Sequence, residues 1–472
     1  MLDDLPLTVD RTADEPLSVQ VADGLRSAAT TGVLRSQDRL PSSRALAQRL
    51  GVSRTVIAAA YDQLHAEGWI TGRTGSGTYL TTAPATPPAR AVSGIATDRN
   101  PDLLDLFPGA PCVEAIDRAA WRRAWRTAAD ADPAVRKDRA GEPEFRAAVA
   151  EHLLRHRGLG AASDTDVIAT AGTSSAVSEL AAALLRPGDT VAIENPGYQR
   201  AVGAFRAAGI RVLPVPVDSG GLPVDLLPTH IAAVYCTPAH QFPIGARMPA
   251  ARRVQLVEFA RAAGIFVIED DYDGELRYDT APLPLLAAMA PDVVVHLGTT
   301  SKILSPALGV GWLVAAPEIT EAVLAHRDRT GTGPSPAGQR VLAELARHGD
   351  LARHLRRLRR LLPPRRELLV SALRGRGLDV VGDDAGSHLV VPLPSAEAEA
   401  RAVVTGRAAG LDLDGLARHH LREPTAPPTA QSTEPHTFGI ALGYTALDWS
   451  DLAIAAPRAA ACLAGLDLRA NP

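Results

Sequence analysis

One lysine stands where an amine could do covalent chemistry. Lys302 ends residues 298–302 (Gly-Thr-Thr-Ser-Lys), which follow a short apolar run and are rich in small hydroxylated side chains. Only Lys137 and Lys302 among the 49 basic side chains are lysine, so this chain uses arginine almost wherever a positive charge suffices. A lysine amine can form a Schiff base with a carbonyl compound, which a guanidinium cannot do. The hydroxyls of Thr299 and Ser301 could bind an anionic group beside it.

A burst of carboxylates forms a second candidate cluster. Residues 265–273 read Ile-Phe-Val-Ile-Glu-Asp-Asp-Tyr-Asp, an apolar strand pattern that ends in acids. In an α/β sheet, residues just past the carboxyl end of a strand line the ligand crevice. A carboxylate such as Asp270 can there keep a pyridine nitrogen protonated, so that the ring withdraws electrons. Alone, Asp270 would more simply be a helix cap or a surface acid; with Lys302 it predicts a cofactor site.

Two further segments could supply the rest of such a site. Residues 169–176 are typical of a strand, a glycine and a helix start. The N–H groups after Gly172 and the hydroxyls of Thr173 and Ser174 would there form a phosphate cradle. Tyr198 follows a Glu-Asn-Pro-Gly turn and could stack on a heteroaromatic ring. Each segment alone is explained as well by an ordinary capped helix or a core tyrosine, so the prediction depends on their combination.

The elements that must position these residues follow from the periodicity. From about residue 103 onward, helical windows alternate with short β-branched runs, which predicts an α/β domain with a mostly parallel sheet. Residues 81–101 are rich in proline and lack apolar periodicity, which is typical of a linker. Residues 351–362 carry leucines at helical spacing among many arginines; an amphipathic helix is favoured there over a second nucleic-acid surface.

Residues 16–80 have a different pattern. Apolar spacing predicts helices at 19–31, 44–50 and 54–67, with Ser42 or Ser43 and Ser53 as N-caps and Gly51 in the intervening turn. Two short strands around a Gly-rich tip follow. This order predicts a winged helix-turn-helix.

The chemistry of that module fits DNA. Between residues 32 and 80 there are six arginines against three acids, although the whole chain has a net charge of −4. The start of the third helix and the glycine-rich tip can approach base edges and phosphates. The residues expected to contact DNA are Arg44, Ser53, Arg54, Thr55, Arg73 and Gly75. A three-helix interaction module with solvated arginines is the alternative.

Composition sets the remaining limits. The 472 residues are 46% hydrophobic and 22% charged, which excludes a disordered chain or a wholly basic coat protein. Three scattered cysteines exclude a disulfide framework and a Cys-rich zinc site. The acidic N-terminus lacks the pattern of a secretion signal, and no apolar run is long enough to span a bilayer. A cytoplasmic protein without a membrane segment is expected.

Two sets of motifs resemble known families. Arg39-Leu-Pro-Ser-Ser-Arg-Ala-Leu-Ala, Gly51-Val-Ser-Arg-Thr-Val and Arg73-Thr-Gly-Ser-Gly-Thr resemble the GntR type of winged helix. Arg186-Pro-Gly-Asp, Glu194-Asn-Pro-Gly-Tyr, Thr237-Pro-Ala-His-Gln-Phe-Pro-Ile-Gly and the segments around Asp270 and Lys302 resemble the fold-type-I aminotransferase site for pyridoxal 5'-phosphate (PLP). Together they resemble the MocR/GabR family of transcriptional regulators.

This resemblance implies a domain plan. It places a DNA-binding domain at 12–80, a linker at 81–101 and an aminotransferase class I/II-like effector domain at 102–472. That domain would have a mostly parallel sheet and a smaller C-terminal α+β subdomain at 347–472. It also implies a homodimer that binds paired half-sites on double-stranded DNA.

The resemblance also implies a role for each site residue. Lys302 would form the internal aldimine with PLP, Asp270 would pair with the ring nitrogen, and Tyr272 would bond the phenolic oxygen. Tyr198 would stack on the ring, and Arg200 would contact the carboxylate of an amino-acid effector. The phosphate would be held by residues of two segments: Gly172, Thr173, Ser174, Thr299 and Ser301.

Three positions depart from the family pattern. Gly309 replaces the arginine that normally binds phosphate, and Ser174 stands where glutamine is usual. Ala441-Leu-Gly-Tyr occupies what resembles the place of a carboxylate-binding Arg-Leu-x-Phe segment. Weaker phosphate and carboxylate binding are therefore expected, with at most partial transamination.

These observations favour a regulator that senses PLP or its adduct with an amine or amino acid. One alternative is an active aminotransferase with an accessory DNA-binding domain. Another is a regulator that has lost PLP binding, which Gly309 would support and which Lys302 and Asp270 oppose.

Overall fold

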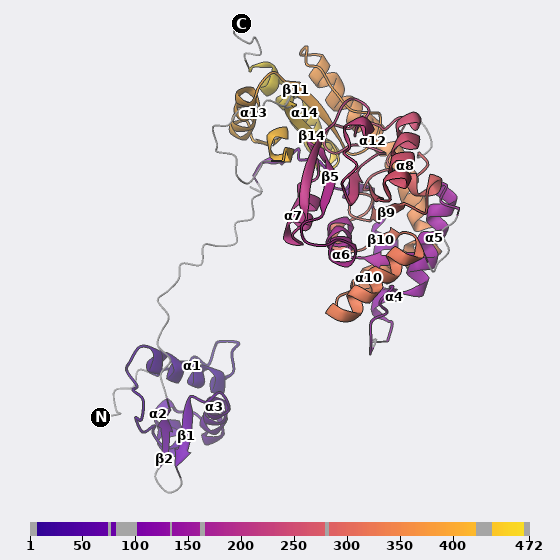
Figure 1. Ribbon diagram of the computed structural model, residues 1–472. Coiled ribbons are helices and arrows are strands. Elements are labelled where there is room, and N and C mark those ends of the chain that lie inside the picture. The colour runs from indigo at the N-terminus through magenta and orange to yellow at the C-terminus, as the bar shows by residue number, and fades with distance from the viewer. Residues whose placement is uncertain are drawn as a thin grey trace. The chain divides into compact units, whose positions relative to one another are not determined.

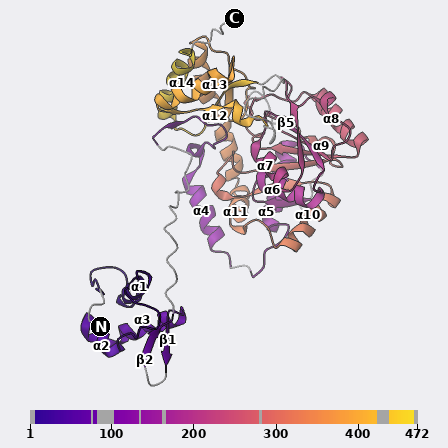
Figure 2. The same ribbon diagram turned by 60° about the vertical axis from the view of Figure 1, so that its left-hand side comes forward.

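The computed structural model describes residues 7–73, 77–81, 102–132, 135–160, 166–278, 283–421 and 437–466. Contacts divide the chain into two units, residues 1–99 and 100–472 (Figures 1 and 2). Among the described residues, no helix is long and apolar enough to cross a membrane.

The first unit is a winged helix-turn-helix. Its elements are α1 (Leu17–Thr30), α2 (Ser43–Leu50), α3 (Arg54–Ala66), β1 (Ile70–Arg73) and β2 (Gly77–Leu80). Ser42 accepts a hydrogen bond from the Ala45 N–H and Ser53 accepts one from the Val56 N–H, so both predicted caps form. Gly51 ends α2 in the left-handed conformation, at φ +63°. The predicted helices and hairpin are confirmed, with ends that differ by one or two residues.

The second unit is built on a seven-stranded sheet in the order β4-β10-β9-β8-β7-β5-β6. Its strands are β4 (Val167–Thr170), β5 (Thr190–Asn195), β6 (Arg211–Pro216), β7 (Ala233–Cys236), β8 (Phe266–Asp271), β9 (Val294–Thr299) and β10 (Gly311–Val314). All neighbouring pairs are parallel except those of β10, which runs antiparallel to β4 and β9. The mostly parallel sheet predicted from the sequence is confirmed.

Helices cover both faces of this sheet (Figures 1 and 2). On one face, Ile168, Ile193 and Leu297 pack with buried residues of α6 (Thr173–Leu184), α7 (Gln199–Ala207) and α10 (Pro317–Thr330). On the other, Val167, Ala192 and Val267 pack with α5 (Pro143–Arg157), α8 (Ala250–Ala263) and α11 (Pro336–Arg347). Successive strand residues alternate between the two cores, so the strands read as continuous apolar runs.

A smaller layer follows in the sequence. The antiparallel sheet β11-β14-β13 comprises β11 (His388–Leu393), β14 (Phe438–Gly443) and β13 (Asp414–Gly415). The helices near it are α12 (Asp350–Arg374), α13 (Ala396–Ala408) and α14 (Trp449–Ala464), and β3 (Leu104–Asp105) pairs with β12 (Leu411–Asp412). The remaining elements are α4 (Arg118–Ala129), α9 (Leu286–Met289) and the 3-10 turns Val113–Ala115, Val224–Leu226, Pro306–Leu308 and Leu416–His419.

The arginine-rich helix is amphipathic, as predicted. In α12, Leu351, Leu355 and Leu358 are buried, whereas Arg356 and Arg360 are exposed. The leucine spacing therefore reflects packing of one helix face into the core.

Candidate functional site

The carboxyl ends of four strands meet at one edge of the large sheet. Lys302 follows β9, Gly172 follows β4 and Tyr198 follows β5. Asp270 is the second-last residue of β8. The sequence pattern placed Asp270 just past its strand, but β8 continues through Asp271 because that residue still pairs with Gly298 of β9. The structure thus brings four separate sequence segments to one crevice edge, as the topology of α/β sheets requires.

Lys302 is half-buried, and its amine is held by the backbone. Its Nζ donates a hydrogen bond to the Gly109 carbonyl oxygen at 2.6 Å, across 193 residues of sequence. A Cβ built at Gly109, whose φ is +86°, would lie 3.0 Å from that Nζ. Glycine at 109 therefore lets the chain approach the amine closely. This partner of Lys302 was not singled out from the sequence.

Asp270 is a buried carboxylate with one unused oxygen. Its side chain is 3% exposed, its Oδ2 accepts a hydrogen bond from the Tyr235 hydroxyl, and its Oδ1 has no hydrogen-bond partner among the described residues. Burial raises the pKa of this carboxyl to about 7, against the hydrogen bond from Tyr235. A buried acceptor without a donor costs free energy until a ligand N–H or O–H reaches it. A protonated ring nitrogen is a donor of that kind, so the residue fits a pyridine cofactor.

Tyr198 contacts the candidate phosphate cradle. Its hydroxyl lies 2.8 Å from Ser174 Oγ, and its ring meets Phe242 edge-on, with centroids 6.2 Å apart. Burial raises the pKa of the Tyr198 phenol, and hydrogen bonds with Ser174 and Arg200 counter part of that rise. Arg200 is exposed on the first turn of α7. The structure therefore places Tyr198, Ser174 and Arg200 together.

The candidate phosphate cradle has two walls. Gly172 caps α6 at φ +111°, ahead of Thr173 and Ser174, so the helix N-terminus opens toward the site. Thr299 Oγ1 donates to Ser301 Oγ at 3.0 Å, and a Cβ built at Gly172 would lie 3.8 Å from Thr299 Oγ1. The predicted N–H and hydroxyl groups of both segments are therefore neighbours.

Gly309 leaves room where a side chain could stand. It ends a 3-10 turn at φ +58°, and a Cβ built on it meets no atom within 4 Å. Two residues on, a Cβ built at Gly311 would lie 3.0 Å from the Gly172 Cα, so this segment passes beside the α6 N-terminus. The departure from the family pattern thus removes a cation near the cradle.

The C-terminal segment offers no cation in place of the usual arginine. Ala441 is fully buried in β14, and Tyr444 is buried with its hydroxyl donating to the Ala385 and Gly386 carbonyls at 3.1 and 3.0 Å. Tyr444 is therefore a core residue. Weaker binding of a substrate carboxylate stays a prediction, and its reason is that neither Ala441 nor Tyr444 provides a guanidinium.

Tyr272 is turned toward a buried histidine. Its hydroxyl donates to the His240 carbonyl oxygen at 3.0 Å and lies 3.1 Å from His240 Nδ1. The sequence motif at residues 237–245 contains His240 but indicates no role for it. Its position between two prolines, Pro238 and Pro243, was the available signal, because such segments hold a fixed loop shape.

In the first unit, the polar residues at the start of α3 are exposed. Arg44, Arg54 and Thr55 are exposed, Thr55 Oγ1 lies 2.7 Å from Ser53 Oγ, and Arg54 Nε donates to Ser43 Oγ at 3.4 Å. Arg73 ends β1, but its side chain and the whole of Gly75 lie outside the described residues. The exposed start of α3 is the part of such a fold that enters the major groove.

The first unit is thus a winged helix-turn-helix, and the second is a fold-type-I transferase domain with a lysine and an aspartate at its crevice. Residues 102–425 match the aminotransferase class I and II family, and residues 17–80 match the gntR family of bacterial regulatory proteins. The chain belongs to the MocR/GabR family, in which these two domains are fused. Membership implies PLP as the cofactor of the aminotransferase fold.

Two curated relatives span most of the chain. The pyridoxine biosynthesis transcriptional regulator PdxR of Corynebacterium glutamicum is 36% identical over 375 residues, covering 79% of this chain and 82% of that protein. The probable rhizopine catabolism regulatory protein MocR of Rhizobium meliloti is 31% identical over 468 residues, covering 94% and 92%. Among solved structures, kynurenine aminotransferase of Pyrococcus horikoshii is 25% identical, covers 77% of this chain and 91% of that one, and has a TM-score of 0.67.

Proposed function

We propose that this chain is a PLP-dependent transcriptional regulator. Its first unit would bind operator DNA, and its aminotransferase-like unit would sense PLP or a PLP adduct with an amine or amino acid. The observation that carries the proposal is one chain that combines a GntR-type head with Lys302 and a buried, half-satisfied Asp270 at a transferase crevice. The relatives named as regulators support it.

Each site residue would contribute one interaction. Asp270 Oδ1 would accept the ring N–H, and Lys302 Nζ, released from the Gly109 carbonyl, would be the covalent anchor. Tyr198 would cover the ring face. The phosphate would meet the N–H groups after Gly172 and the hydroxyls of both cradle walls, Thr173, Ser174, Thr299 and Ser301. When bound, PLP supplies an aldehyde that captures amines and a ring that withdraws electrons.

Tyr272 and Arg200 complete the proposed contacts. The Tyr272 hydroxyl would leave the His240 carbonyl to bond the phenolic oxygen of the ring. Arg200, exposed beside Tyr198, would bind the carboxylate of an amino-acid effector through its planar guanidinium. In the winged helix-turn-helix unit, Arg54 and Thr55 would reach base edges. The sugar-phosphate backbone of the DNA would be contacted by Arg44, Ser53, Arg73 and Gly75.

The domain plan belongs to the same proposal. The boundaries 12–80, 81–101 and 102–472 agree with the division of contacts near residue 100 and with the matched segments 17–80 and 102–425. Residues 347–472, with their own three-stranded sheet, would form the small subdomain. A homodimer would present two heads to paired half-sites.

Absorption spectroscopy tests the cofactor part of this proposal. Purified full-length protein titrated with PLP should develop a band near about 420 nm, the signature of an activated lysine bound to the cofactor. The Lys302→Ala variant should lack the band, and the Lys137→Ala variant should keep it, because Lys137 is the other lysine of the chain and is exposed. Absence of the band from the wild type at saturating PLP would favour the regulator that has lost PLP.

Turnover assays separate regulator from enzyme. With a 2-oxo acid as acceptor, the proposal expects at most one conversion per chain, because Ala441 and Gly309 provide no guanidinium for the carboxylate or the phosphate. Many turnovers per chain would instead identify an active aminotransferase with a DNA-binding accessory domain.

A further inference from the structure

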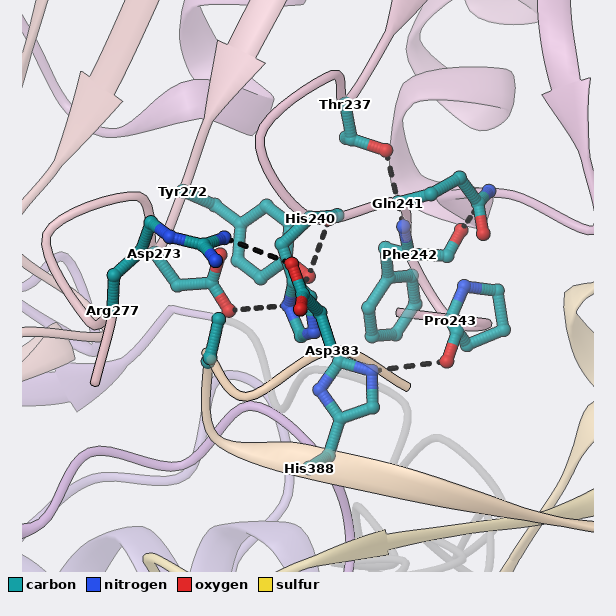
Figure 3. A network of polar contacts seen from close by, with 12 residues as sticks. Thr237, His240, Gln241, Phe242, Pro243, Tyr272, Asp273, Arg277, Asp383 and His388 are labelled. Atoms are coloured by element: carbon teal, nitrogen blue, oxygen red, sulfur yellow. Dashed lines mark hydrogen bonds and ion pairs between the residues drawn. The ribbon is translucent and has the colours of Figure 1, made fainter. Parts of the chain in front are cut away.

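A buried cluster of two histidines and a carboxylate lies next to Tyr272 (Figure 3). Its members are His240 and Asp273, which follow β7 and β8, and His388, the first residue of β11. All three are at most 3% exposed. One potential ligand atom from each lies within 4.8 Å of the other two, and no other such group occurs among the described residues. The three side chains have no role in the functions proposed above, although the His240 backbone carbonyl holds the Tyr272 hydroxyl.

Each member has one atom held and one atom unused. His388 Nε2 lies 3.0 Å from the Pro243 carbonyl oxygen, which can only accept, so its proton is on Nε2 and the lone pair is on Nδ1. His240 Nδ1 lies 3.0 Å from Asp273 Oδ2, which places its proton on Nδ1 and the lone pair on Nε2. The unused atoms are His240 Nε2, His388 Nδ1 and Asp273 Oδ1; none has a hydrogen-bond partner.

These unused atoms share one chemical property. With each histidine ring in the single-proton form that its hydrogen bond selects, all three are electron-pair donors, so none can satisfy another by hydrogen bonding. The nearby guanidinium of Arg277 is engaged at 2.9 Å with Asp383. Among the described residues no donor reaches the three unused atoms, so an electron-pair acceptor would satisfy them.

Glycines let the backbone approach the His240 ring closely. A Cβ built at Gly386, whose φ is +73°, would lie 2.2 Å from His240 Cε1 and 2.8 Å from Asp273 Oδ2. A Cβ built at Gly245 would lie 3.1 Å from His240 Nε2. A side chain at either position would occupy the space next to the ligand atoms.

We propose that His240, Asp273 and His388 form a binding site for one divalent transition-metal ion, with Zn²⁺ as the best match. Two neutral imidazoles and a carboxylate are a ligand set that zinc accepts, and water can complete four-fold coordination. The Pro243 carbonyl that holds His388 Nε2–H is the kind of outer partner that orients a ligating histidine. Ligand atoms in a tetrahedral zinc site are about 3.4 Å apart, so separations of up to 4.8 Å would each have to close by about 1.4 Å at most.

The site would connect two sheets. His388 begins β11 of the three-stranded sheet, whereas His240 and Asp273 follow strands of the seven-stranded sheet. A bound ion would fix these segments to each other and raise the thermal stability of the second unit.

Metal uptake by the full-length protein tests the proposal. After treatment with a chelator and buffer exchange, the protein is titrated with Zn²⁺, and bound metal is measured by elemental analysis after removal of free ion. Uptake of one Zn²⁺ per chain is expected, with a rise in Tm. Cobalt(II) added instead should give visible absorption bands of a low-coordinate, nitrogen- and oxygen-ligated ion.

Variants locate the ion. His388→Gln and Asp273→Asn, both close in shape to the wild type, should each lower Zn²⁺ affinity at least about 10-fold, as loss of a ligand or its partner does. The exposed His230→Gln is the matched control and should bind as the wild type does. Circular dichroism verifies that each variant is folded.

Two results would overturn the proposal. The wild type could fail to take up stoichiometric Zn²⁺ or Co²⁺, in which case an ordered water satisfies the three atoms. Alternatively, folded His388→Gln and Asp273→Asn variants could bind as tightly as the wild type, which would place the metal elsewhere. Because Lys302→Ala should bind Zn²⁺ normally, neither result depends on cofactor binding.

Discussion

At the scale of single residues, ionisation of the buried Asp270 lowers the stability of the folded protein, as is typical of a group that binds a ligand. Its folded-state pKa of about 7 lies above the ordinary value of about 3.9 because the carboxyl is buried. Between those two values the folded protein holds a proton that the unfolded chain has lost. Stability therefore falls as pH rises through this window and levels off above about 7. The stability lost to this ionisation is what a protonated ring nitrogen would restore.

Asp270→Asn should therefore stabilise the cofactor-free protein at pH 8 and abolish tight PLP binding. The expected gain is on the order of 2 to 4 kcal/mol at pH 8 and should shrink toward zero below about pH 3, where wild-type Asp270 is protonated in both states. Thermal melts across that pH range measure it, with the exposed Asp62→Asn as a control. A variant less stable than the wild type at pH 8 would contradict this account of Asp270.

Gly309 provides the second residue-scale prediction. Gly309→Arg would place a guanidinium in open space beside the cradle, and a charge-assisted hydrogen bond to phosphate contributes about 1.5–3 kcal/mol. The left-handed backbone at φ +58° costs a non-glycine residue roughly 1–2 kcal/mol of stability in either ligand state. PLP affinity should rise by about 10-fold or more while Tm falls. Gly309→Ala should show the fall in Tm without the gain in affinity, and equal PLP affinities for both variants would refute the prediction.

At the scale of elements, local patterns predicted the helices and strands well. Short β-branched runs between helical windows predicted the mostly parallel sheet, and serine caps located α2 and α3 within two residues. The segments that contain Asp270 and Lys302 each end or follow an apolar run. Because the carboxyl ends of parallel strands lie at the same edge of a sheet, the sequence predicted that these two residues share a crevice. By contrast, contacts such as Lys302 with Gly109 or His240 with His388 join segments more than a hundred residues apart. Local periodicity does not predict such long-range contacts, because they depend on how the helices and sheets pack against one another.

The exposed start of α3 supports a prediction about DNA. Arg54→Ala should weaken operator binding and relax preference at one base position, at about 1–3 kcal/mol. Arg44→Ala should weaken binding to all sequences alike and reduce the salt dependence by about one counterion. Fluorescence anisotropy with operator and unrelated duplexes, at several salt concentrations, separates the two. The exposed Arg211→Ala of the other unit serves as control, and operator affinity unchanged in both head variants would exclude this face as the DNA contact.

At the scale of the whole molecule, the two units must communicate if the protein is a regulator. A ligand shifts an equilibrium between two arrangements only by its difference in affinity for them. If PLP changes operator affinity by some factor, linkage requires that operator DNA change PLP affinity by the same factor, commonly about 5 to 150.

Reciprocal titrations test this coupling. Operator affinity is measured by anisotropy with and without saturating PLP, and PLP affinity by the band near about 420 nm with and without operator duplex. The two ratios should agree in size and direction. Lys302→Ala should bind operator with one affinity whether or not PLP is present, because its cofactor anchor is gone. If the wild-type ratios are both one, PLP is a passive occupant and an amine effector must carry the signal; adding amino acids that shift the band then decides which amine changes operator affinity.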